Sequence, residues 1–168
     1  AANFGLWARG SLKPGEGLNA KMDEVTASMA LAVMDEWPRR IAERQRFAAD
    51  LNSRARAYGL ATFCPVGSEA TSPWQCFAVK LPDDVSADAV VWGCMEAGLQ
   101  VRRYYLPLPG QAQSAPNAQA LSSRTVCLPV YDGALAARSD DVWSIFAAVV
   151  EAARDPARFA AGAIAISA

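Results

Sequence analysis

Histidine is absent from the 168 residues of this chain. Its absence excludes Ser-His-Asp and Cys-His nucleophile systems, His-ligated zinc, and acid–base catalysis by histidine. Lysine is scarce and occurs only at Lys13, Lys21 and Lys80. Charge is nearly balanced, since 16 Lys and Arg residues oppose 17 Asp and Glu residues for a net charge of −1. We therefore expect no nucleic-acid partner and no attraction to an anionic membrane surface.

The four cysteines are too widely spaced for a known thiol motif. They lie at Cys64, Cys76, Cys94 and Cys127, and no C-x-x-C pair occurs. A zinc ribbon, a redox motif or a small disulfide scaffold is therefore not expected, and we predict no metal site. Cys76 and Cys127 lie in apolar runs, which predicts buried small hydrophobic side chains in a reducing compartment.

Long hydrophobic runs are also missing. The first ten residues lack the basic and apolar regions of a secretory signal. The apolar stretch at 159–168 has about half of the ~20 residues that span a bilayer. These absences predict a cytoplasmic protein without a membrane span. The chain opens on Ala1-Ala2-Asn3 without a methionine, as if it started inside a longer polypeptide.

The longest periodic pattern predicts a helix that starts near Asn19 or Ala20. Apolar residues recur at spacings of three and four along one face, at Met22, Val25, Met29 and Val33. Trp37-Pro38 predicts a kink or a new helix, because proline removes a backbone donor and restricts the residue before it. Gly59 predicts the end of the helix.

After Gly59 the pattern changes to short alternating segments. Alternation from Trp74 to Leu81 predicts a strand. Ser86 is predicted to be the N-cap of a helix that ends at Gly98, and Asp140 is predicted to cap a last helix. Further strands are predicted at 99–105 and 125–130, with an irregular loop at 106–120 between them. The order predicts an α/β (α+β) fold, in which a long kinked helix precedes a small mixed β-sheet with helices.

One segment, residues 13–24 (KPGEGLNAKMDE), favours anion binding. Glycines followed by a helix N-terminus present unpaired N–H groups at the positive end of a dipole. Asn19 adds an amide donor and Lys21 a cation, which together suit one phosphate group. Alternatively, Asn19 is an N-cap and Lys21 a solvated surface residue. Neither G-x-x-x-x-G-K-[ST] nor G-x-G-x-x-G occurs, so known nucleotide-binding loops are not predicted.

A second candidate is the segment 101–111 (VRRYYLPLPGQ), where a predicted strand enters a proline-rich loop. Tyrosine and arginine at a strand exit often line a ligand cleft. The alternative is that one tyrosine packs under the loop and that both arginines pair with surface carboxylates.

Three motifs in a fixed order resemble the DegT/StrS-type sugar aminotransferases. They are NFG (residues 3–5) with GLNAKMDEVTASMAL (17–31), then VRRYYLPL (101–108), and then TVCLPVYDGAL (125–135). The resemblance runs from about Asn3 to Arg154. It implies a fold-type-I enzyme dependent on pyridoxal 5′-phosphate (PLP), of which this stretch is the C-terminal part of a polypeptide about twice as long.

The resemblance also implies roles for individual residues. Residues 1–21 would form the end of the large domain with the phosphate motif, and 22–168 the long helix and small domain. Asn19 would reach the PLP phosphate of the neighbouring subunit in a homodimer. Lys21 stands where many members have Arg, which keeps the charge without the planar fork. Arg103 and Tyr105 would line the substrate cleft.

The implied reaction moves an amino group from an amino acid, with glutamate as the expected donor, to a keto-sugar nucleotide. The family's PLP-binding lysine and its pyridinium-pairing aspartate lie upstream of the NFG segment and have no counterpart here. Many members have histidine after the Pro-Leu of Y-x-P-L, where this chain has Pro109. We therefore predict that this chain alone is inactive and needs a homodimer or a complementary large-domain polypeptide.

Two alternatives remain open. The chain could be a non-catalytic module for dimerisation or for binding a sugar or effector, derived from the same fold. It could also belong to a dehydratase relative, in which histidine replaces the PLP lysine. Both depend on the sequence upstream.

Overall fold

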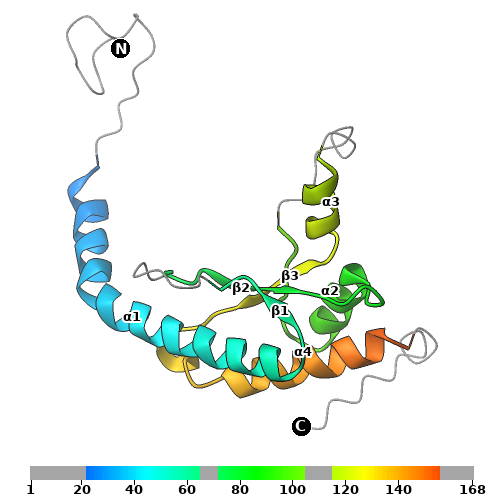
Figure 1. Cartoon of the computed structure of the whole chain (residues 1–168). Helices are drawn as coiled ribbons and strands as arrows, with labels where there is room; N and C mark the ends of the chain where they lie inside the picture. The colour runs from blue at the N-terminus through cyan, green and yellow to red at the C-terminus, as the bar shows by residue number, and fades with distance from the viewer. Residues whose placement is uncertain (1–21, 65–71, 105–114, 156–168) are drawn as a thin grey trace, which may run out of the picture. The chain divides into compact units, whose positions relative to one another are not determined.

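A computed structural model describes residues 22–64, 72–104 and 115–155. The chain forms two compact units, Ala1–Pro38 and Arg39–Ala168, which are described separately below. The described part contains the helices α1 (Glu24–Ala57), α2 (Ala87–Glu96), α3 (Pro116–Ser122) and α4 (Ser139–Ala153) and the short 3₁₀ helix η2 (Gly133–Leu135) (Figure 1). None of these helices combines the length and the apolar character that a membrane crossing requires.

Helix α1 begins later than the sequence predicts. Its N-cap is Asp23, whose carboxylate accepts hydrogen bonds from the Thr26 backbone N–H and hydroxyl, both at 2.8 Å. The pKa of Asp23 is lowered, chiefly because the Thr26 N–H stabilises the charged form. The prediction of a start near Asn19 or Ala20 is therefore wrong, because Asp23 caps α1 and the helix begins at Glu24.

The first unit contributes the N-terminal part of α1. Its large apolar side chains are exposed to solvent, with Val25 at 70%, Met29 at 67% and Val33 at 54%. The helix continues through Pro38 instead of restarting there.

In the second unit, α1 ends at Ala57, close to the predicted end at Gly59. Gly59 has a φ of 83°, and the Leu60 N–H donates to the Ala55 carbonyl at 2.8 Å. This left-handed residue closes the helix because glycine adopts positive φ at low cost. Phe47, Ala48 and Leu51 of α1 are buried in the core.

Within the described residues the sheet has three strands, in the order β1 (Ala61–Thr62), β2 (Cys76–Lys80) and β3 (Thr125–Pro129). Helices combined with this small sheet confirm the predicted α/β (α+β) class, and among the described strands both pairings are antiparallel, where a mixed sheet is predicted. The predicted strand at 99–105 is wrong over its described residues, where only a single bridge joins Arg102 to Cys127.

Alternation gives the sheet two different faces. We call Phe77, Val79, Val126 and Leu128 the core face, because all four are fully buried. They pack in one cluster with residues of α1, α2 and α4. Cys76, Ala78, Thr125 and Cys127 point to the other side, which we call the pocket face. Figure 1 shows α4 and α3 on opposite sides of the sheet.

Helix α2 agrees closely with its prediction. The Ser86 hydroxyl accepts a hydrogen bond from the Ala89 N–H, and Gly98 follows the helix with a φ of 77°.

Two predictions about the later helices are wrong. Residues 116–122 form α3 where a loop was predicted, because Pro116 occupies the first helical position, where its missing N–H costs nothing. Asp140 lies inside α4, whose N-cap is Arg138.

Candidate functional site

A pocket of about 400 Å³ opens on the pocket face of the sheet. The strands contribute its floor, formed by Cys76, Ala78, Thr125 and Cys127. These residues share one side because the side chains of a strand alternate, and because the register pairs Ala78 directly with Cys127. The floor is therefore a consequence of the same alternation that buries Phe77 and Leu128 on the core face.

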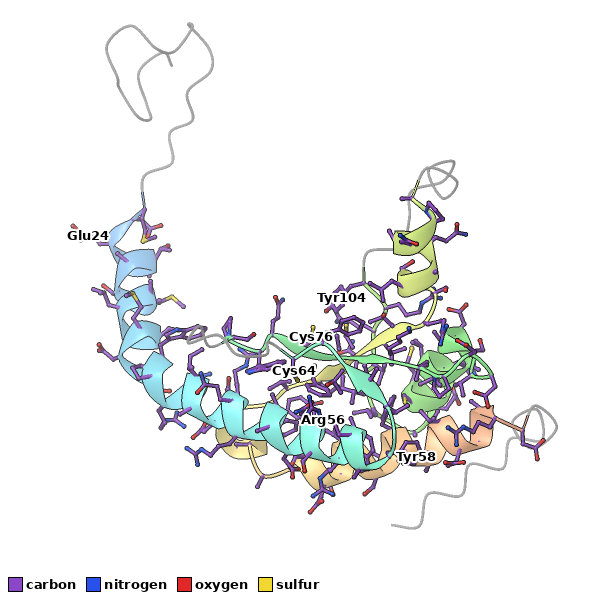
Figure 2. The ribbon with its side chains drawn as sticks, in the orientation of Figure 1. Glu24, Arg56, Tyr58, Cys64, Cys76 and Tyr104 are labelled. Carbon is purple, nitrogen blue, oxygen red and sulfur yellow. The ribbon has the colours of Figure 1, made fainter. Side chains whose placement is uncertain are left out.

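Loops and helix α3 build the walls of this pocket. Leu121 and Ala118 come from α3, Phe63 follows β1, and Tyr104 follows the Arg102 bridge. Tyr104 and Cys76 lie beside this pocket (Figure 2). The walls are mostly apolar, so the pocket suits an apolar or soft group better than a phosphate.

The hydroxyl groups of the pocket are engaged within the protein. The Thr125 hydroxyl donates to the Leu121 carbonyl at 2.7 Å, and the Ser122 hydroxyl donates to the Gln119 carbonyl at 3.1 Å. No lysine or arginine is among the described residues that line the pocket. The pocket floor therefore offers two thiols as its reactive groups.

Burial controls the state of those thiols. The pKa of Cys127 is raised to about 12, first by burial and then by the neighbouring Cys76. Cys127 is buried as predicted, whereas Cys76 is only half-buried. Cys94 lies in the core, where burial raises its pKa to about 12.

Arg103 is a predicted cleft residue, and the structure places it at a junction of helices. Its guanidinium pairs with Asp88 of α2 and donates to the Ser122 carbonyl of α3 at 3.2 Å. It does not line the pocket. This arrangement matches the alternative in which an arginine of this segment pairs with a surface carboxylate. Tyr105, the other predicted cleft residue, lies outside the described residues.

The predicted phosphate contacts Asn19 and Lys21 also lie outside the described residues. The nearest described feature is the tip of α1, where the Asp23 carboxylate already accepts the Thr26 N–H. The roles of Asn19 and Lys21 at a phosphate stay predictions.

The motif at 125–135 has a clear structural task. After β3 the chain turns at Gly133 (φ 62°), whose N–H donates to the Glu43 carboxylate of α1 at 2.8 Å. Asp132 pairs with Arg40 at 3.3 Å and with Arg44 at 3.9 Å. The pKa of Glu43 is lowered, first by the Gly133 N–H and then by Arg39. These contacts fasten the turn after β3 to the long helix.

Sequence reasoning found only one part of the pocket, because the segment 101–111, which is predicted to line a ligand cleft, contributes Tyr104 to it. Alternation in 74–81 and 125–130 indicated that each strand has two faces, but not that one face stays open. Tyr104, Phe63 and Leu121 come from segments whose contacts depend on the tertiary fold. The sequence also predicts Cys76 and Cys127 only as buried hydrophobic residues, and it does not predict that both lie on the pocket face.

Comparison with known proteins identifies the family. The model of the DegT/DnrJ/EryC1/StrS aminotransferase family matches residues 4–149. The chain therefore belongs to this family, as its motifs predict. No curated protein matches the chain.

Several solved structures share the fold. Aminotransferase TlmJ from Streptoalloteichus hindustanus has 18% identity and a TM-score of 0.65, over 81% of this chain and 38% of that chain. DesI, in the presence of its TDP-sugar product, has 22% identity and a TM-score of 0.67, over 87% of this chain and 39% of that chain. An E. coli GDP-4-keto-6-deoxy-D-mannose-3-dehydratase with bound hydrated PLP has 16% identity and a TM-score of 0.64, over 79% of this chain and 37% of that chain. The chain thus spans less than two fifths of the length of these structures.

Proposed function

We propose that this chain supplies the C-terminal part of a PLP-dependent aminotransferase that acts on a keto-sugar nucleotide with an amino acid donor such as glutamate. The observation that carries the proposal is the family match over residues 4–149. It is supported by the likeness to DesI, a structure with a TDP-sugar product, and to a dehydratase with bound PLP. The short share of those chains that is covered supports a role as one part of a larger catalytic unit.

The described residues do not by themselves build a PLP site. Lys80 is the lysine of the described part, and it pairs in the sheet with Ala61 and Thr125 without lining the pocket. The pocket offers no cation for a phosphate. We therefore assign no catalytic step to the described residues, and we keep Asn19 and Lys21 as the proposed phosphate contacts across a homodimer interface.

This assignment predicts that the 168-residue chain forms no stable adduct with PLP when it is alone. The reason is that none of the three lysines matches the family's PLP-binding position, which lies upstream. After incubation with PLP and reduction with borohydride, intact mass spectrometry should detect less than about 0.1 equivalent of adduct, because the lysines are not activated. A stoichiometric adduct at a single lysine would overturn the assignment.

A Lys80→Arg variant provides the matched control. It preserves the charge on β2 but cannot form an imine with PLP, so it should show the same low background as the parent chain. If the parent chain gave an adduct that Lys80→Arg lacked, the small domain itself would hold PLP.

A non-catalytic dimerisation or sugar-binding module is the second candidate. The exposed apolar residues of α1 favour it, because they suit a protein partner as well as a large domain. Sequencing upstream of the Ala1 codon separates the two. A reading frame with a large domain and a PLP lysine supports the enzyme, a histidine in place of that lysine supports a dehydratase, and a start near Ala1 supports the module.

A further inference from the structure

The two cysteines of the pocket face lie on adjacent strands. The register pairs Cys76 with Pro129 and Ala78 with Cys127, so the cysteines are diagonal neighbours on one face. Both cysteines line the same pocket, and Cys76 is a direct neighbour of Cys127 that contributes to raising its pKa. Cys64 and Cys94 differ, because the Cys64 thiol donates to the Asn52 side chain at 3.1 Å and Cys94 is fully buried in the core.

The spacing of this pair suits a bridging atom better than a direct bond. Diagonal neighbours in an antiparallel pair have Cα atoms about 7–8 Å apart. A disulfide joins Cα atoms about 4.4–6.8 Å apart through a sulfur–sulfur bond of about 2.05 Å. A metal ion about 2.3 Å from each sulfur lengthens that link to about 4–5 Å between the sulfurs. The longer link therefore suits a diagonal pair better than a direct disulfide does.

The surroundings limit which ion fits. Thiolates are soft ligands that favour Cu(I) and zinc over hard cations such as magnesium. Zinc requires about four ligands in a structural site. Within 22–64, 72–104 and 115–155, no group of three or more His, Cys, Asp or Glu side chains could hold a metal ion. Two sulfurs in an apolar pocket therefore match a soft ion of low coordination number.

We propose that Cys76 and Cys127 bind one Cu(I) ion between their sulfur atoms. No metal site is expected from the sequence because it has no C-x-x-C motif. The spacing of cysteines in the sequence does not predict, however, that the sheet places Cys76 and Cys127 on adjacent strands. This proposal is independent of the proposed function, because it uses residues of the second unit alone.

The test is an anaerobic titration of the 168-residue chain with Cu(I) held by a coloured competing chelator. We expect the chain to withdraw one equivalent. Cys76→Ser and Cys127→Ser should each lower the affinity by more than about 100-fold, since changing even an indirect partner of a metal ligand costs about 10–100-fold. Cys64→Ser is the matched control, because Cys64 is also half-buried and free, and it should retain the parent affinity.

Two further measurements keep the proposal falsifiable if Cys127→Ser fails to fold. X-ray absorption of the copper-loaded parent chain should report two sulfur ligands. Intact mass spectrometry without copper should show four free thiols. Failure to withdraw Cu(I), an equal loss in Cys64→Ser, a different ligand set, or a spontaneous disulfide between Cys76 and Cys127 would each overturn the proposal.

Discussion

Replacing Phe77 by alanine is expected to destabilise the second unit by about 3–5 kcal/mol, because a large cavity opens in its core. Phe77 is fully buried on the core face of β2, and its ring lies 5.9 Å from that of Trp74. A loss of this size is a large part of the roughly 5–15 kcal/mol that stabilises a typical domain. Urea unfolding followed by circular dichroism measures the change.

Phe63→Ala is the matched control for this prediction. Phe63 has the same side chain and follows the neighbouring strand, but it is 45% exposed and lies at the pocket. Its replacement should cost about 1 kcal/mol, because only part of its apolar surface leaves water on folding. Equal losses for both variants would contradict the assignment of Phe77 and Phe63 to opposite faces of the sheet.

Glutamate at Met29 and Val33 is expected to abolish association through the N-terminal part of α1. We expect the parent chain to self-associate, or to bind a large-domain polypeptide, through the face that carries Val25, Met29 and Val33. Burying each side chain contributes about 1.5–3 kcal/mol. Losing two of them weakens association by at least about 100-fold, since each 1.4 kcal/mol is tenfold. Sedimentation velocity over a range of chain concentrations measures the shift.

Leu31→Glu controls for the added charge. Leu31 is 62% exposed and lies two residues from Met29, which places it on the opposite side of the helix. This variant should self-associate like the parent chain. A parent chain that stays monomeric at every concentration and takes up no large-domain partner would argue against an interface on this face.

Much of the fold could be predicted because local chemistry decides it. Ser86 and Gly98 delimit α2 through an N-cap hydrogen bond and a positive φ, both of which depend on residue type alone. The two longer strands follow from alternation at 74–81 and 125–130. Position within the fold decides the rest. Residues 99–104 have the sequence pattern of a strand, yet among them only Arg102 forms a β-bridge, to Cys127. Apolar alternation alone therefore does not predict a strand here.

The site was harder to predict than the fold. The sequence predicts Arg103, near the end of a predicted strand, as a cleft residue; in the described residues its guanidinium contacts Asp88 and the Ser122 carbonyl, and its role toward a ligand stays a prediction. Arg103 and Asp88 are 15 positions apart in the sequence. Their contact depends on how α2 packs, and the spacing of residues in the sequence does not predict that packing. The resemblance added what local patterns could not, namely the family, which the match over 4–149 confirms.

We propose that this chain completes a PLP enzyme and holds the cofactor's phosphate through Asn19. The most direct measurement is PLP affinity, by equilibrium dialysis, of the chain assembled with the polypeptide that carries the PLP lysine. Asn19→Ala should weaken PLP binding by about 10–100-fold, which corresponds to one hydrogen bond to a charged group. Asn117→Ala, on the exposed helix α3, should leave it unchanged. Equal PLP affinity in the parent chain and Asn19→Ala would contradict the account.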